Sequence, residues 1–231
     1  DLIAYYFPEC EGINMDATVT SILHKSQEEL EMLARKKVKH LYLGIESGLD
    51  DVLKFMKKDH DLAQAYQAID RLHEAGLIYD AHIMTGVAGK GRGMENAEAL
   101  AQFLNRTNPA HVVNFSMFLH KEVPLYQDIR QGTFVPADEL ETIREEYHLI
   151  ERIAPEKAGA NILYDGFHDF IHVRVRGHLP GDKEKMLAKL NGIIQEYEGK
   201  EPVYSFVQGE CPDLEYCDDG KAVWDMDRKT S

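Results

Sequence analysis

The chain has 231 residues, of which 44% are hydrophobic and 29% are charged, and its formal net charge is −14. Enough apolar material is present to bury the core of one large domain, and the acidic balance counts against a nucleic-acid partner, which requires clustered Lys and Arg. No apolar run approaches the roughly 18–20 residues of a membrane span, and no signal peptide is visible, so we expect a cytoplasmic protein without a membrane partner.

Strand-like and helical patterns alternate along the first 120 residues. Apolar, often β-branched runs predict strands over residues 13–22, 38–47, 78–86 and 111–119. Helices are expected between them, because Ser26 and Glu29 form a capping box and apolar residues recur at helical spacing over 62–72. Strands separated by helices predict parallel pairing with right-handed crossovers, as in a barrel or a doubly wound sheet.

The pattern changes after residue 120. A long amphipathic helix is expected from Asp138 to Pro155, followed by a polar stretch over 159–181 and a last helix that ends before Gly199. The tail from residue 200 is acidic and irregular. We therefore predict an α/β protein with two parts: a partial (β/α) barrel over residues 1–135, and a helical C-terminal extension with an acidic tail over residues 136–231.

The three cysteines, Cys10, Cys211 and Cys217, have spacings that fit no zinc or iron–sulfur motif. We interpret them as reduced thiols of a cytosolic protein; chelation of a metal by Cys211 and Cys217 with a histidine stays open as the alternative. Because the first residue is Asp1 and not Met, we expect the chain to be cut from a longer gene product.

Candidate binding residues come from the carboxyl ends of the predicted strands, where α/β sheets and barrels bind ligands. This rule selects Thr20, Glu46, Ser47, Gly86 and Gly89. The carboxylate of Glu46 either accepts hydrogen bonds from an amine or a ribose, or favours the start of the next helix. The glycines either bring backbone amides to a carboxylate or phosphate, or form an ordinary flexible loop.

Histidines give a weaker signal. A histidine inside a predicted strand, as at His82, is more often packed and hydrogen-bonded than a ligand. Packing or surface roles are also the default for His168, His172 and His178, with metal binding as the lesser alternative. No Ser-His-Asp arrangement, P-loop or H-E-x-x-H helix is readable, so no catalytic residue is assigned and no metal ligand is predicted.

Three segments together resemble the radical SAM (S-adenosylmethionine) superfamily. They are LYLGIESGLDDVLKFMKKDH, AIDRLHEAGL with IYDAHIMTGVAGKG and RGMENA, and NPAHVVNFSMF with LHKEVPLY. The first segment is similar to the family's fourth strand with its L-G-[IV]-[EQ]-S turn, and the second to the next strand–helix unit with its G-x-x-G turn. The third is similar to the sixth strand with its G-T-P-L-Y segment, where this chain has Glu122 and Val123 in place of Gly and Thr. Residues 161–194 are similar to the extension of uncharacterised members labelled oxygen-independent coproporphyrinogen oxidases.

The resemblance implies an open barrel of six strands. It also implies a C-x-x-x-C-x-x-C loop that binds a [4Fe–4S] cluster, and cleavage of SAM to a 5′-deoxyadenosyl radical. The four predicted strands correspond to the third through sixth of that barrel, and the cysteine triad is missing from this chain. We therefore expect an oxidoreductase in full length, and a fragment that stably binds neither SAM nor the cluster and is inactive alone.

The resemblance also assigns SAM contacts. Glu46 matches the position that reaches SAM, and Lys58 matches the basic residue that approaches the SAM carboxylate. His82 stands where relatives carry a ribose-binding Asp. Gly86 and Gly89 match the turn that passes the adenine, and Thr20 is a looser match at the end of the third strand.

Two other functional classes stay open. One is a metal- or phosphate-dependent (β/α) barrel lyase that uses Glu46, His82 and the glycine-rich turn. The other is a non-catalytic, barrel-derived binding module. An open barrel edge also predicts self-association of the isolated chain. The small-molecule substrate cannot be identified from the sequence.

Overall fold

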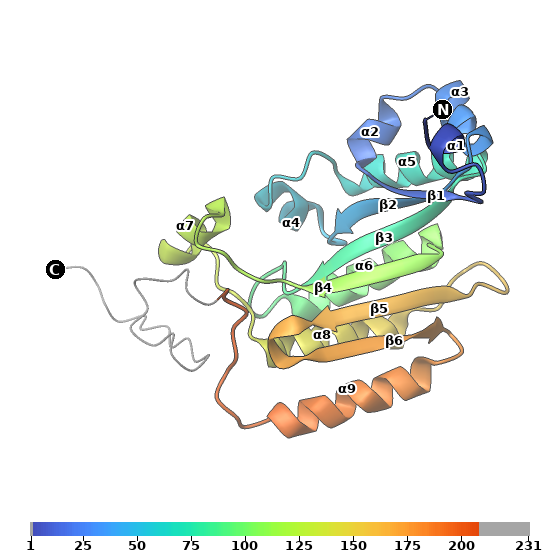
Figure 1. Ribbon diagram of the computed structural model, residues 1–231. Coiled ribbons are helices and arrows are strands. Elements are labelled where there is room, and N and C mark those ends of the chain that lie inside the picture. The colour runs from blue at the N-terminus through green and yellow to red at the C-terminus, as the bar shows by residue number, and fades with distance from the viewer. Residues whose placement is uncertain (1, 208–231) are drawn as a thin grey trace.

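The computed structural model describes residues 2–207 (Figure 1). The predictions for Cys211, Cys217 and the later part of the acidic tail lie outside these residues. Along the chain, the helices and strands are α1 (Leu2–Tyr6), β1 (Ile13–Ala17), α2 (Val19–Leu23), α3 (Gln27–Arg35), β2 (Val38–Glu46), α4 (Asp50–Phe55), α5 (Leu62–Glu74), β3 (Ile78–Thr85), α6 (Gly93–Thr107), β4 (His111–Ser116), α7 (Pro124–Arg130), α8 (Glu139–Arg152), β5 (Ile162–His168), the 3-10 turn η1 (Asp169–Ile171), β6 (Val173–Leu179) and α9 (Lys183–Tyr197).

One six-stranded sheet organises the molecule, in the order β1-β2-β3-β4-β5-β6. The pairs from β1 to β5 are parallel, and β6 runs antiparallel to β5. Figure 1 shows α6 and α8 behind the sheet, with α9 beside β6. A sheet whose parallel strands follow chain order is wound in one direction, as in a barrel, whereas a doubly wound sheet reverses its order. The predicted α/β class is therefore confirmed, and the barrel alternative is the one observed.

A single hydrophobic core lies between the helices and the sheet. It joins strand residues such as Leu43 and Ile83 to Leu72 of α5, Leu100 of α6 and Ile150 of α8. A smaller apolar cluster lies at the carboxyl ends of the strands and includes Val52, Val87, Met117 and Ile129. This second cluster positions α4 and α7 around the strand ends, where the candidate site is expected.

The capping signals predicted from the sequence are present. Ser26 accepts a hydrogen bond from Glu29 N while Glu29 accepts one from Ser26 N, which is the predicted capping box of α3. Asp138 begins α8 by accepting from Glu141 N at 2.8 Å. Among residues 2–207, no helix combines the length and the apolar character that crossing a bilayer requires.

Two segments differ from the sequence prediction. The strand expected over 13–22 ends at Ala17, because the Thr18 hydroxyl accepts from Ser21 N at 3.0 Å and begins α2. The polar stretch over 159–181, expected to be irregular, forms β5 and β6, which extend the sheet from β4. Its apolar face, with Tyr164 and Val175, is buried in the core. The division of the chain at residue 135 stays a prediction, and the sheet continues across it.

Candidate functional site

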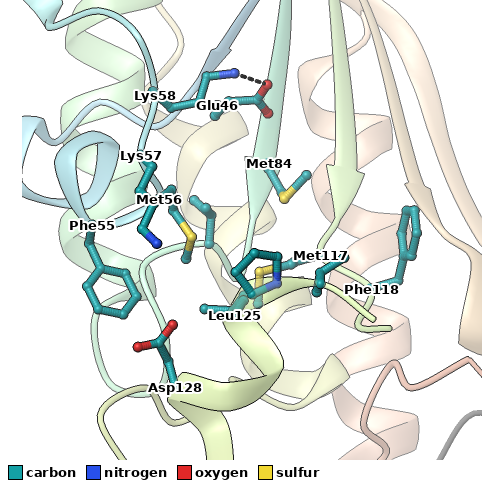
Figure 2. A pocket seen from close by; sticks show the side chains of 13 residues that line it. Glu46, Phe55, Met56, Lys57, Lys58, Met84, Met117, Phe118, Leu125 and Asp128 are labelled. Carbon is teal, nitrogen blue, oxygen red and sulfur yellow. Dashed lines mark hydrogen bonds and ion pairs between the residues drawn. The ribbon is translucent and has the colours of Figure 1, made fainter. Parts of the chain in front are cut away.

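A cavity of about 440 Å³ opens at the carboxyl ends of β2, β3 and β4 (Figure 2). Parallel strands bring their carboxyl ends to one edge, where the loops that follow them form a common mouth. The cavity is walled by these strand ends, by the segment after α4 and by the start of α7. Its lining residues are Glu46, Phe55, Met56, Lys57, Lys58, Met84, Val87, Met117, Phe118, Val123, Pro124, Leu125 and Asp128.

Glu46 occupies an unusual backbone conformation at the end of β2. Its φ angle is +63°, and the β2–β3 register shifts between Gly44 and Glu46. A left-handed conformation costs a non-glycine residue of order 1 kcal/mol or more, and such residues concentrate at functional sites. This conformation aims the Glu46 carboxylate into the cavity, where Oε1 lies 3.1 Å from Lys58 Nζ.

The ion pair is only partly buried, because the Glu46 and Lys58 side chains are 23% and 29% exposed. Gly44 leaves the space that the pair uses: a Cβ there would lie 2.7 Å from Glu46 Oε1 and 3.4 Å from Lys58 Nζ. Figure 2 shows the pair at one end of the cavity and Asp128 at the other. The two residues predicted to contact SAM are thus brought together.

Thr20 lies outside this cavity lining. Its hydroxyl donates to Asp59 Oδ2 at 2.6 Å and to the Asp59 carbonyl at 3.1 Å. The hydrogen bond from Thr20 is the main cause of a lowered pKa for the Asp59 carboxyl. Thr20 therefore anchors α2 to the segment that carries Lys58, and does not itself border the cavity.

Ser47 is fully buried beside Glu46 and points away from the cavity. Its hydroxyl donates to Asn96 Oδ1 at 2.6 Å and accepts from Leu49 N at 3.1 Å. In this conformation Ser47 links the end of β2 to α6.

His82 lies on the face of the sheet opposite the helices. Its ring centroid is 5.1 Å from that of Tyr42 and 5.9 Å from that of Phe115, so it forms part of a row of rings across neighbouring strands. His82 is not among the residues that line the cavity.

The glycine-rich turn after β3 has the backbone geometry that glycine favours, with φ angles of +83° at Gly86 and +80° at Gly89. Its amides are already used. Gly86 N donates to Glu145 Oε2 at 2.9 Å, Gly89 N donates to the Gly86 carbonyl at 3.0 Å, and Gly91 N donates to the carboxylate of Glu141. Gly89 borders a second cavity of about 270 Å³, together with Lys90 and Arg92.

Three buried glutamates on α8 were not found by sequence reasoning. Glu139 and Glu146 hold His168 between them, with Glu139 Oε2 3.0 Å from His168 Nδ1 and Glu146 Oε2 3.1 Å from His168 Nε2. Burial acts to lower the pKa of His168, but the two carboxylates outweigh it and raise the pKa to about 9. Burial raises the pKa of the third, Glu145, to about 8.

A sequence signal for this cluster did exist. Glu146 follows Ile143 by three residues and precedes Leu149 and Ile150 by three and four, so the helical period places it on the buried face of α8. A charged residue at such a position requires a buried partner, which His168 provides.

The described residues do not hold a set of ligands for an iron–sulfur cluster. Cys10 is the one cysteine in this part of the chain, its thiol is free, and it donates to the Gly12 carbonyl at 3.2 Å. No group of three His, Cys, Asp or Glu side chains within residues 2–207 is arranged to hold a metal ion.

The cavity does suit a zwitterion with an apolar body. Glu46 offers a carboxylate to an ammonium group, and Lys58 offers an ammonium to a carboxylate. Met84, Val87 and Met117 supply an apolar wall beside them. SAM has an aminocarboxylate end of this kind, joined to a ring system.

The chain is similar to known proteins in part of its sequence and in its fold. Residues 3–104 match the family described as the radical SAM superfamily. Over 119 residues the chain is 25% identical to the tRNA uridine(34) acetyltransferase of Methanocaldococcus infernus (strain DSM 11812 / JCM 15783 / ME), which is 51% of this chain and 22% of that protein.

A solved structure, the archaeal Methanocaldococcus infernus Elp3 with an N-terminal deletion (1–46), is similar with a TM-score of 0.60 and 17% identity. The similarity covers 81% of this chain and 42% of the Elp3 chain, and it shows a shared fold. The matches thus show similarity to the radical SAM superfamily over residues 3–104 and a shared fold over most of the chain. The similarity to members labelled coproporphyrinogen oxidases stays a prediction.

Proposed function

We propose that this chain is part of a radical SAM enzyme, and that the Glu46–Lys58 end of the cavity binds the aminocarboxylate of SAM. The observation that carries the proposal is the left-handed conformation of Glu46, which faces Lys58 inside a cavity at the strand ends. The chain covers 22% of the length of the acetyltransferase and 42% of the Elp3 chain. The activity of the whole enzyme, an oxidoreductase in our proposal, is therefore inferred and not transferred from either of them.

The two side chains would act as a pair of complementary anchors. Each neutralises the other in the free protein. A zwitterionic ligand places its ammonium against Glu46 and its carboxylate against Lys58, so neither protein charge is left unpaired. Gly44 keeps the space beside both side chains open, and the methionines of the cavity take up the apolar part of the ligand.

Residues 2–207 hold no set of cysteine ligands. We therefore propose that the ligands of a [4Fe–4S] cluster are residues of the full-length protein outside this range. We also propose that the isolated chain is inactive and does not bind SAM stably. The catalytic residues are not assigned.

Isothermal titration calorimetry with SAM on the full-length, cluster-reconstituted protein tests the SAM site. Loss of one charge-assisted hydrogen bond is expected to weaken binding about 10- to 100-fold in Glu46→Gln and in Lys58→Met. Lys57→Met is the matched control, because Lys57 also lines the cavity but forms no ion pair with Glu46. Unchanged affinity in the first two variants, or an equal loss in the control, would contradict the assignment.

An electron paramagnetic resonance spectrum of the same reduced protein tests the enzyme class. A cluster signal that changes when SAM is added supports a radical SAM enzyme. A well-folded protein without a cluster favours the lyase or the binding module instead. The turn after β3 has few free N–H groups to bind the phosphate of a phosphate-dependent lyase's substrate, because the amides of Gly86, Gly89 and Gly91 already donate within the protein.

The substrate class has two candidates. The net charge of −14 favours a small molecule, whereas the likeness to a tRNA uridine(34) acetyltransferase favours tRNA. Filter binding of tRNA to the full-length protein at low and physiological salt distinguishes them. Retention of tRNA that falls with rising salt would indicate a tRNA substrate and would contradict the proposal of a small-molecule substrate.

A further inference from the structure

Three glutamates of α8 are buried against the carboxyl ends of the strands, and each of them is at most 1% exposed. Glu145 contacts Gly86, which directly precedes the cavity residue Val87. Its Oε2 accepts from Gly86 N at 2.9 Å, and its Oε1 accepts from Asn96 Nδ2 at 2.7 Å. A single carboxylate therefore ties the turn after β3 to α6.

Asn96 extends this connection to β2. Its Oδ1 accepts from Ser47 Oγ at 2.6 Å and from Gly48 N at 3.3 Å. These two residues directly follow Glu46. Through one amide side chain, Glu145 thus connects the ends of the two strands that bring Glu46 and Val87 to the cavity.

The sequence around the turn leaves room for this carboxylate. A Cβ on Gly86 would lie 2.8 Å from Thr142 Cγ2, and a Cβ on Gly93 would lie 2.9 Å from Glu145 Oε2. Larger residues at either position would push α8 away from the strand ends. The close approach of α8 thus depends on two glycines that flank the turn.

Protonation of Glu145 conflicts with its present hydrogen bonds, because each of its oxygens faces an N–H donor. A proton on Oε2 would oppose the amide of Gly86. A proton on Oε1 would oppose the Asn96 amide group, which can present its oxygen instead only by giving up Ser47 and Gly48. In either case a hydrogen bond to one strand end is lost.

Burial brings the protonation of Glu145 into an accessible pH range. Burial raises the pKa of Glu145 to about 8, and the negative charge of Glu141 on the same helix also raises it. The hydrogen bonds from Asn96 and Gly86 and the positive charge of His168 on β5 act to lower this pKa. Glu139 and Glu146, also on α8, face the same histidine. One imidazolium therefore balances three neighbouring carboxyl groups.

We propose that Glu145 is a positioning residue for the candidate site: its ionised form holds the turns after β2 and β3, and its protonation releases one of them, which weakens ligand binding in the cavity. The effect on ligand binding rests on the proposed function, whereas the movement of the turns does not.

NMR of the ¹⁵N-labelled chain, following the amide resonances of Gly86 and Gly48 between about pH 6 and about pH 10, tests the movement. At least one resonance is expected to shift with a midpoint near pH 8. In Glu145→Gln this step should be absent, leaving only a step near pH 9 from His168. In the control Glu141→Gln the titration persists, with a lower midpoint because a nearby negative charge is gone. Fixed resonances in the wild type, or an unchanged titration in Glu145→Gln, would overturn the proposal.

Calorimetry with SAM on the full-length protein at about pH 7 and about pH 9 tests the effect on binding. Between the lower and the upper pH, the affinity of the wild type should rise about fivefold relative to that of Glu145→Gln, as expected for one hydrogen bond. The ligand's own ammonium group titrates equally in both proteins and cancels in this comparison. Equal pH dependence in both proteins would overturn this part. A failure to bind SAM at either pH would refute the proposed function and leave the amide titration to decide the movement. If Glu145→Gln does not fold, the wild-type titration and its persistence in Glu141→Gln decide.

Discussion

Replacing His168 by Gln should make the stability of the chain less dependent on pH. His168 is fully buried between Glu139 and Glu146, and its pKa is raised from 6.5 to about 9. The folded state therefore binds the imidazole proton more tightly than the unfolded state. This stabilisation is fully present below pH 6.5 and is lost as the pH rises through about 9. At about 1.4 kcal/mol for each pH unit, the raised pKa corresponds to roughly 3 kcal/mol of unfolding free energy.

Urea denaturation of the wild type and His168→Gln between about pH 6 and about pH 9.5 measures this quantity. The difference in unfolding free energy should be largest at the acidic end and should shrink by roughly 3 kcal/mol toward the alkaline end. His148→Gln is a matched control on α8, because His148 is partly exposed and burial lowers its pKa. A difference between the wild type and His168→Gln that stays constant over the whole range would refute a charged, paired His168.

Two further predictions concern the packing of α2 and the edge of the sheet. Arg71→Met should cost roughly 2 kcal/mol of unfolding free energy in the same assay, because the guanidinium donates to the carbonyls of Ile22, Leu23 and Lys25; a loss below the error of the measurement would contradict this role. The isolated chain should self-associate with rising concentration in light scattering, since α1 exposes Leu2, Tyr5 and Tyr6 by 68–78% beside the edge strand β1. Tyr5→Ser with Tyr6→Ser should reduce the association, and a clean monomer of the wild type at high concentration would exclude it.

The strands that the sequence predicted well are those whose apolar runs face the helices. The runs over 38–47, 78–86 and 111–119 contain β2, β3 and β4 within three residues at each end, because burial against α5, α6 and α8 requires apolar side chains on the face toward the helices. The strand predicted over 13–22 is longer than the observed strand β1, which ends at Ala17. Its β-branched residues suit a strand or a short helix, and the capping box of Thr18 and Ser21 decides for the helix.

The strands β5 and β6 were missed because only one of their faces is apolar. Tyr164 and Val175 point into the core, whereas Asp165 accepts two hydrogen bonds from Arg174 on the opposite face, at 2.7 and 2.6 Å. Charged residues that pair across an antiparallel hairpin make the sequence look polar and irregular. The alternation that identifies a half-buried strand is present in residues 173–176 and was overlooked, whereas the ion pair across the hairpin becomes visible only in the folded structure.

The candidate site shows a similar division between local and long-range information. Glu46 and Gly86 could be located from the sequence, because each lies at or directly after the end of a strand, and strand ends follow from a local pattern. The partner of Gly86 could not be located, because Glu145 is 59 residues further along the chain.

This distant contact changes how a glycine-rich turn should be interpreted. Free amides in such a turn predict an anionic ligand, but here the anions that occupy the turn after β3 are carboxylates of α8, on Gly86 and Gly91. In the proposed function, recognition of a ligand's charge then falls to the Glu46–Lys58 pair, whose side chains still reach solvent. In our proposal the turn keeps an indirect part in binding, because the carboxylate that holds it also holds, through Asn96, the residues that follow Glu46. A ligand held by Glu46 would therefore be sensitive to a change at Glu145, although Glu145 is not among the residues that line the cavity.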